Sequence, residues 1–205
     1  MSTEIETRVA ATVAGQTPKA IRQEFQRVLK RSAVSAGRAR LQLSFRDVIY
    51  FCFKKELEQE GISVGPDERR ELYSVFRRNV AHSGRWRRDG QQLKRSGNVP
   101  VVFDLGPIIN RSSSELRAYR LGSTRIERNP EICGGQPVFR GTRVPVQQVV
   151  EQIRQGVPVE QLREDYPALD RAALSYAALK ARMGNDPGRP PGRLQIRRAA
   201  GEAAD

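Results

Sequence analysis

Residues 44–61 constrain the fold of this chain more than any other stretch. Ser44 followed by Asp47 is a short form of the capping box that starts a helix, and Gly61 is typical of a helix end. Between them, apolar residues recur on one broad face, at Phe45, Val48, Ile49, Cys52, Phe53 and Leu57. A stripe this wide indicates a helix buried on most of its surface. We therefore expect other elements of the first half of the chain to pack around a central helix.

Shorter helices are predicted on both sides of this central helix. Residues 7–14 form one candidate, ended by Gly15, and Thr17-Pro18 marks the cap and first residue of the next. That next helix carries one apolar face, made of Ile21, Phe25, Val28 and Leu29. A further helix, from about Asp67, turns Leu72, Val75 and Phe76 inward. Two short helices joined by a glycine turn have the layout of a helix-turn-helix, whose second helix enters the major groove of DNA.

The polar face of that second helix is suited to DNA. The residues we expect to contact DNA there are Thr17, Lys19, Arg22, Gln23, Gln26 and Arg27. Arginine can read guanine, glutamine can read adenine, and both can hold phosphates. The alternative is a solvated face on an ordinary helical hairpin.

A basic hairpin is predicted after the helices. Asp89-Gly90 favours a two-residue turn, and residues 101–104 favour another strand. The stretch 77–95 has one acid, Asp89, among the cations Arg77, Arg78, Arg85, Arg87, Arg88, Lys94 and Arg95. We expect phosphate contacts from Arg85, Arg87, Arg88 and Lys94. Trp86 is expected to pack on a sugar or to support an Arg by stacking. With this hairpin as the wing, residues 1–104 are expected to form a winged helix-turn-helix. The alternative is that the basic stretch is a charged surface loop.

A second module is predicted at residues 123–183, joined to the first by a connecting helix at 105–122. It begins with a strand at 124–128 and a small β-hairpin at 137–144. Val146, Val149, Val150 and Ile153 then mark an amphipathic helix ending at Gly156. A short helix at 159–166 and a helix capped by Asp170 complete a trihelical, helix-turn-helix-like unit, with Leu169 and Leu174 as a hydrophobic staple. Residues 184–205 are expected to be a flexible basic tail. The predicted fold class is mainly α.

The charge of the chain agrees with a polyanionic partner. The formal net charge is +13, and most of the excess lies in residues 1–99. The alternative is a protein whose composition is simply rich in arginine.

Cys52 and Cys133 are too few and too far apart for a disulfide framework or a zinc cluster, and Cys52 is expected to be a buried thiol. Because no stretch resembles a signal core or a membrane span, we expect a cytoplasmic protein.

Residues suited to catalysis are scarce. The single histidine, His82, lies among arginines without a partner for a triad or a metal site, and Glu164-Asp165 is expected to be a solvated pair. We therefore expect no enzymatic activity, no metal and no cofactor. A nucleic-acid-processing enzyme is the hypothesis that the sequence supports least. The glycine-rich stretch near residue 134 lacks the Lys-Ser/Thr of a phosphate-binding loop. It is expected to be a structural turn built by Gly134, Gly135, Arg140, Gly141, Thr142, Arg143 and Pro145.

The same stretch carries a resemblance to a known family. Residues 129–182 resemble the small domain of unknown function found in many bacterial VapB-type antitoxins. The resemblance lies in Asn129-Pro130, Cys133-Gly134-Gly135, Pro137-Val138, Arg140-Gly141-Thr142-Arg143 and Val144-Pro145-Val146, followed by Gly156, Glu164-Asp165-Tyr166-Pro167 and the Ala-rich helix from Asp170. The first half is similar to the winged helix-turn-helix of the MerR group, through residues 43–48 and 60–63. Phe25 stands where that group often has a tryptophan in its recognition helix.

The resemblance implies a role as a type II antitoxin. Such proteins neutralise a VapC-like toxin, a PIN-domain ribonuclease with acidic residues and a divalent metal. They also repress their own operon by binding its DNA as dimers or larger assemblies. Residues expected to contact the toxin are in the tail: Arg193, Leu194, Ile196, Arg197 and Arg198. An Arg placed among the carboxylates of the nuclease would displace metal and form bidentate pairs. The C-terminal module is the other candidate for toxin binding or dimerisation, and a transcriptional regulator without a toxin is the alternative function.

Overall fold

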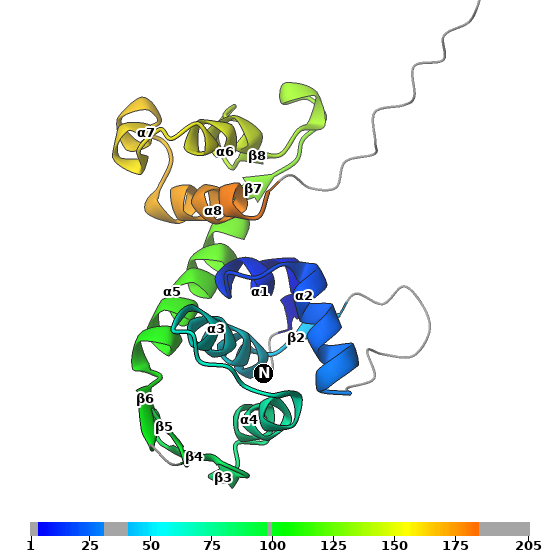
Figure 1. Cartoon of the computed structure of the whole chain (residues 1–205). Helices are drawn as coiled ribbons and strands as arrows, with labels where there is room; N and C mark the ends of the chain where they lie inside the picture. Colours follow the sequence, from blue (N-terminus) through cyan, green and yellow to red (C-terminus); the bar gives the residue numbers. More distant parts are fainter. Residues whose placement is uncertain (1–3, 31–40, 98–99, 185–205) are drawn as a thin grey trace, which may run out of the picture.

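The computed structural model describes residues 4–30, 41–97 and 100–184. This part of the chain is mainly helical with small antiparallel sheets, as the predicted fold class requires. Figure 1 shows a larger N-terminal group of helices and a smaller C-terminal group, with the long helix α5 between them. The toxin-contact residues predicted at 193–198 lie outside the described residues.

The N-terminal helices are α1 (Thr7–Val13), α2 (Pro18–Gln23), the wider π-helical turn η1 (Glu24–Val28), α3 (Phe45–Gln59) and α4 (Pro66–Arg78). Two of them, α2 and α3, begin at the predicted caps. The Thr17 hydroxyl accepts a hydrogen bond from the Ala20 amide at 3.1 Å, and Ser44 and Asp47 form the expected capping box. Gly15 turns the chain between α1 and α2 with φ of 61°. Local sequence therefore sets where these helices start and stop.

Helix α3 is the centre of the larger core, as its wide apolar stripe predicts. Tyr50, Phe51, Cys52 and Phe53 are all buried, and elements α1, α4 and α5 pack around them. Phe25 of η1 meets Phe51 edge-to-face, with ring centroids 5.3 Å apart. Ala10, Ala11 and Ala14 keep α1 thin enough to approach α3 closely. Strands β1 (Ile5–Glu6) and β2 (Gln42–Leu43) pair beside this core.

The predicted hairpin is part of a four-stranded antiparallel sheet. Its strands, in order, are β3 (His82–Ser83), β4 (Trp86–Asp89), β5 (Gln92–Arg95) and β6 (Val101–Asp104). The turn is one residue later than expected, because Asp89 pairs with Gln92 and leaves Gly90-Gln91 as the connection. Only Gly90 has positive φ there, as in turns of type II′. Burial of Trp86 and Leu93 beneath the sheet fixes this register.

The second module contains the predicted three helices. Helix α5 (Gly106–Ser123) leads to β7 (Ile126–Glu127), the short 3₁₀ turn η2 (Cys133–Gly135), β8 (Val138–Phe139), α6 (Val146–Arg154), α7 (Val159–Asp165) and α8 (Arg171–Arg182). The strand expected at 124–128 is shorter and pairs with β8. The hairpin expected at 137–144 is a tight turn with one bridge, between Val138 and Pro145. Leu169 and Leu174 are buried on either side of the Asp170 cap, as a hydrophobic staple requires.

Helix α8 joins the two halves of the molecule. It packs between α5 and α6, and the rings of Tyr119 and Tyr176 stack with centroids 5.4 Å apart. Gly122 lies where α5 and α8 approach most tightly, since a Cβ there would be 2.2 Å from the Cβ of Tyr176. At the other end, Arg182 donates to the Thr12 carbonyl at 3.1 Å, and Arg8 donates to the Met183 carbonyl at 3.2 Å. These contacts fix the C-terminal helices against α1.

Among the helices of the described residues, none combines the length and the apolar character needed to cross a bilayer.

Candidate nucleic-acid interface

The exposed face of α2 and η1 carries the residues predicted to contact DNA. Lys19, Arg22, Gln26 and Arg27 are exposed, and Gln23 is half-buried. Within the described part of the chain, the three cations make no ion pair with a carboxylate. The charge of this face is therefore available to an external anion.

The π-helical turn decides which side chains reach that face. The Leu29 amide donates to the Glu24 carbonyl at 3.0 Å, five residues back, so η1 is wider than an α-helix. With this geometry Glu24, Phe25 and Val28 point into the core, while Gln26 and Arg27 stay exposed. The polar face thus continues past the end of α2.

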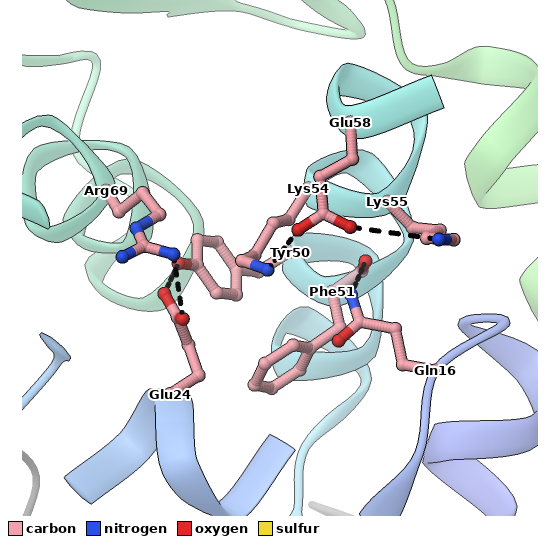
Figure 2. Close-up of polar contacts among 8 residues, drawn as sticks. All are labelled: Gln16, Glu24, Tyr50, Phe51, Lys54, Lys55, Glu58 and Arg69. Carbon is pink, nitrogen blue, oxygen red and sulfur yellow. Dashed lines mark hydrogen bonds and ion pairs between the residues drawn. The ribbon is translucent and has the colours of Figure 1, made fainter. Parts of the chain in front are cut away.

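A buried carboxylate fixes η1 against α3 and α4, as Figure 2 shows. Glu24 is buried; it accepts a hydrogen bond from the Tyr50 hydroxyl at 2.9 Å and one from the Arg69 guanidinium at 3.1 Å. Burial, together with the Glu24 charge, raises the pKa of Tyr50 far above its ordinary value, so the hydroxyl remains a donor. On the other side, Gln16 donates to the Phe51 carbonyl at 2.9 Å. These contacts attach η1 and the turn between α1 and α2 to the central helix.

Sequence reasoning missed this anchor. The available signal was an acid, Glu24, directly beside Phe25 on the apolar face of its helix. A carboxylate in that position needs a cation and a hydroxyl from neighbouring elements, because an unpaired buried charge is costly.

Trp86 does not reach the surface, which corrects the expectation that it packs on a sugar. Its ring is fully buried against Phe53 and Phe103, with centroids 6.0 and 6.1 Å away. It does lie under a cation, since the Arg95 guanidinium is 5.7 Å from the ring centroid. Arg95 also forms two hydrogen bonds with Glu68, at 2.6 and 2.8 Å, so it serves the fold. Arg77 also forms an ion pair within the fold, since its guanidinium lies 3.4 Å from the buried carboxylate of Asp47.

The outer face of the sheet keeps three of the predicted phosphate contacts exposed. Arg87 lies between His82 and Lys94 in register, so these side chains form a row across three strands on one face. Arg85 is exposed in the turn before β4. Arg88 is half-buried and donates to the Gly90 carbonyl at 3.0 Å, which ties it to the turn. The row of Arg87 and Lys94, with Arg85, is the part that can meet a phosphate backbone.

The structure does not bring the cations of the α2 and η1 face together with those of the four-stranded sheet. Helix α4 contacts η1 on one side and β3 and β4 on the other. Figure 1 shows the sheet below α4, away from α2. The hairpin is therefore not adjacent to α2.

The glycine-rich motif of the second module forms turns. Gly134, Gly135 and Gly141 all have positive φ, between 64° and 78°. The Thr142 hydroxyl donates to the Phe139 carbonyl at 2.8 Å and accepts from the Val144 amide, which closes the second turn. Pro145 precedes the first residue of α6. Arg140 and Arg143 point to solvent within this turn.

Other groups with chemical potential are separated in space. Cys52 is buried beside Ser112, with Sγ and Oγ 3.4 Å apart, and burial raises the pKa of its thiol. Cys133 is exposed in η2. In residues 4–30, 41–97 and 100–184, no three side chains of His, Cys, Asp or Glu converge as a metal site would require. Glu164 and Asp165 are exposed on α7.

Comparison with known proteins places a family match on the second module. Residues 126–180 match the family model described as Protein of unknown function (DUF433). A curated relative, the uncharacterized protein y4eO of Sinorhizobium fredii, is 35% identical over 81 residues, which are 40% of this chain and 37% of the relative. The chain therefore matches well under half of that relative's length. No solved structure matches the chain. Over the segment that holds β7, β8 and α6 to α8, the chain is similar to DUF433 domains.

Proposed function

We propose that this chain is a DNA-binding regulator that reads its operator with the exposed face of α2 and η1. The observation that carries the proposal is the set of three cations on this face that form no ion pair among the described residues, Lys19, Arg22 and Arg27. The opposite face of η1 is attached to α3 and α4 through Glu24. A rigid helix with free guanidinium groups and amides has the donors needed for base edges in the major groove. Gln23 and Gln26 lie on the same face and supply those amides.

The sheet supplies a second, sequence-independent contact in this proposal. Arg85, Arg87 and Lys94 hold phosphates on a separate part of the DNA, because α4 separates them from α2. The overall charge of +13 favours association with DNA at low salt.

We further propose that the regulator is the antitoxin of a type II toxin–antitoxin operon, acting as a homodimer. Support comes from the resemblance of residues 129–182 to the domain found in VapB-type antitoxins. In this proposal the partner is a VapC-like PIN-domain ribonuclease, and the arginines at 193, 197 and 198 enter its acidic site. A regulator without a toxin remains the second candidate, and it is favoured by the DNA-binding face alone.

DNA binding is tested by fluorescence anisotropy with the DNA upstream of the gene. Replacing Arg22 and Arg27 with Ala should weaken binding and lower the slope of log K against log salt by about 1 for each lost phosphate contact. The matched control is Arg117→Ala with Arg120→Ala, two exposed arginines on α5. Equal losses in the two variants would contradict the proposed face.

The antitoxin role is tested by co-expression with the product of the adjacent gene. A stable complex by light scattering, with suppressed ribonuclease activity, is the expected result. Removal of residues 188–205 should restore cleavage while leaving DNA binding unchanged. If no complex forms but operator binding persists, the protein is a regulator without a toxin.

A further inference from the structure

A groove between α7 and α8 lies on the second module, away from the α2 face. Its volume is about 690 Å³, within the range of pockets that hold a small ligand. Leu169 and Leu174 form its buried floor, and Val159 and Ala178 widen the apolar lining. Because DNA contacts need polar and cationic surfaces, an apolar floor of this kind is suited to a protein side chain.

The charges at the rim indicate what the occupant carries. Arg163 and Arg171 line the groove, both are exposed, and neither pairs with a carboxylate among the described residues. Of the two acids in the lining, Asp170 is already satisfied: it accepts from the Ala173 amide at 2.8 Å and pairs with Arg125 at 3.0 Å. Glu160 is the one acid left to oppose two free arginines. The rim is therefore net positive.

We infer that this groove docks an acidic, amphipathic helix of a partner protein. Apolar side chains of the helix occupy the floor over Leu169 and Leu174, and its carboxylates meet Arg163 and Arg171. The C-terminal residues of this chain are a poorer fit, since residues 185–205 carry four arginines against three acids. The inference holds whether or not the partner is a toxin, because it rests on the groove alone.

The test uses the full chain and two fluorescent peptides. The acidic probe is a short peptide with Leu on one helical face and Glu on the other; the basic probe has Lys in place of Glu. We expect the acidic probe to bind and the basic probe not to bind. Reversing Arg163 and Arg171 to Glu should weaken the acidic probe about tenfold, as loss and reversal of two rim charges implies.

Two further variants separate the groove from general attraction to a basic protein. Arg117→Glu with Arg120→Glu makes the same charge change on α5 and should leave peptide affinity within about twofold. Ser175→Trp fills the groove without changing charge and should abolish binding, since Ser175 lines it. Arg171 is the first residue of α8, where Glu favours the helix dipole, so its reversal should not unfold the module.

Three results would overturn the inference. The first is equal weakening by the α5 control, and the second is full binding by Ser175→Trp. The third is a wild-type dimer in light scattering that Ser175→Trp converts to a monomer, since the groove would then hold a second copy of this chain.

Discussion

Gly122→Ala should wedge α5 away from α8. The added Cβ would lie 2.2 Å from the Cβ of Tyr176 and 2.6 Å from the Ala172 carbonyl oxygen, both inside the 3.0 Å limit for real Cβ contacts. The Ala172 contact is to backbone, so no change of rotamer can relieve it. The helices must therefore separate, and the stacked rings of Tyr119 and Tyr176 must part.

The size of the effect follows from two opposing terms. Overpacking of a well-filled interface costs about 1–3 kcal/mol and sometimes more, while alanine in place of glycine favours a helix by about 1 kcal/mol. Because two close contacts must be relieved here, we expect overpacking to dominate and the free energy of unfolding to fall by about 1–3 kcal/mol. For a chain of this length that lowers Tm by roughly 2–4 °C per kcal/mol.

Urea unfolding, followed by far-UV and near-UV circular dichroism, measures this loss. The matched control is Ser114→Ala, at an exposed position of the same helix, which should change stability by less than about 0.5 kcal/mol. A Gly122→Ala protein as stable as the wild type, or more stable, would refute the close approach of α5 and α8.

Three further predictions concern buried groups and the tight turn. The raised pKa of Tyr50 means that its native state keeps a proton that the unfolded chain loses, so stability is full below the ordinary pKa of 10.0 and declines as pH rises above it. Tyr50→Phe should flatten that decline in unfolding measured between neutral and alkaline pH, and an unchanged slope would assign it elsewhere. In the native protein a thiol reagent should label Cys133 but not Cys52, whose thiol is buried with a raised pKa; fast labelling of both would contradict the packing of α3 on α5. Gly90→Ala forces positive φ on a residue with a Cβ and should destabilise the sheet by about 1 kcal/mol, and no loss in thermal unfolding would place the turn elsewhere.

Local signals were enough to predict most helices of the described residues. Thr17, Ser44 and Asp170 each accept the backbone hydrogen bond that their position before an apolar stripe predicts. Caps and periodicity depend on residues within a few positions of one another, so they can be read without knowledge of the tertiary fold. The exposed face of α2 could be predicted for the same reason.

Features set by distant pairing could not be predicted. The turn at Gly90-Gln91 depends on the register that buries Trp86 and Leu93 beneath a sheet completed by β6. Trp86 is covered by Phe103 of β6 and by Phe53 of α3, two elements that its local sequence does not indicate. The separation of the basic row from α2 also results from packing on α4, which no local pattern indicates.

The central claim is that the α2 face reads DNA, and selection from random DNA sequences tests it most directly. Arg22 is exposed and unpaired in the described part of the chain, and arginine prefers guanine whereas glutamine prefers adenine. Selection with wild-type protein and with Arg22→Gln should give sites that differ mainly at one position in each half-site, with guanine lost there. Identical selected sites, or no enriched site for either protein, would contradict the assignment of α2 as the recognition helix.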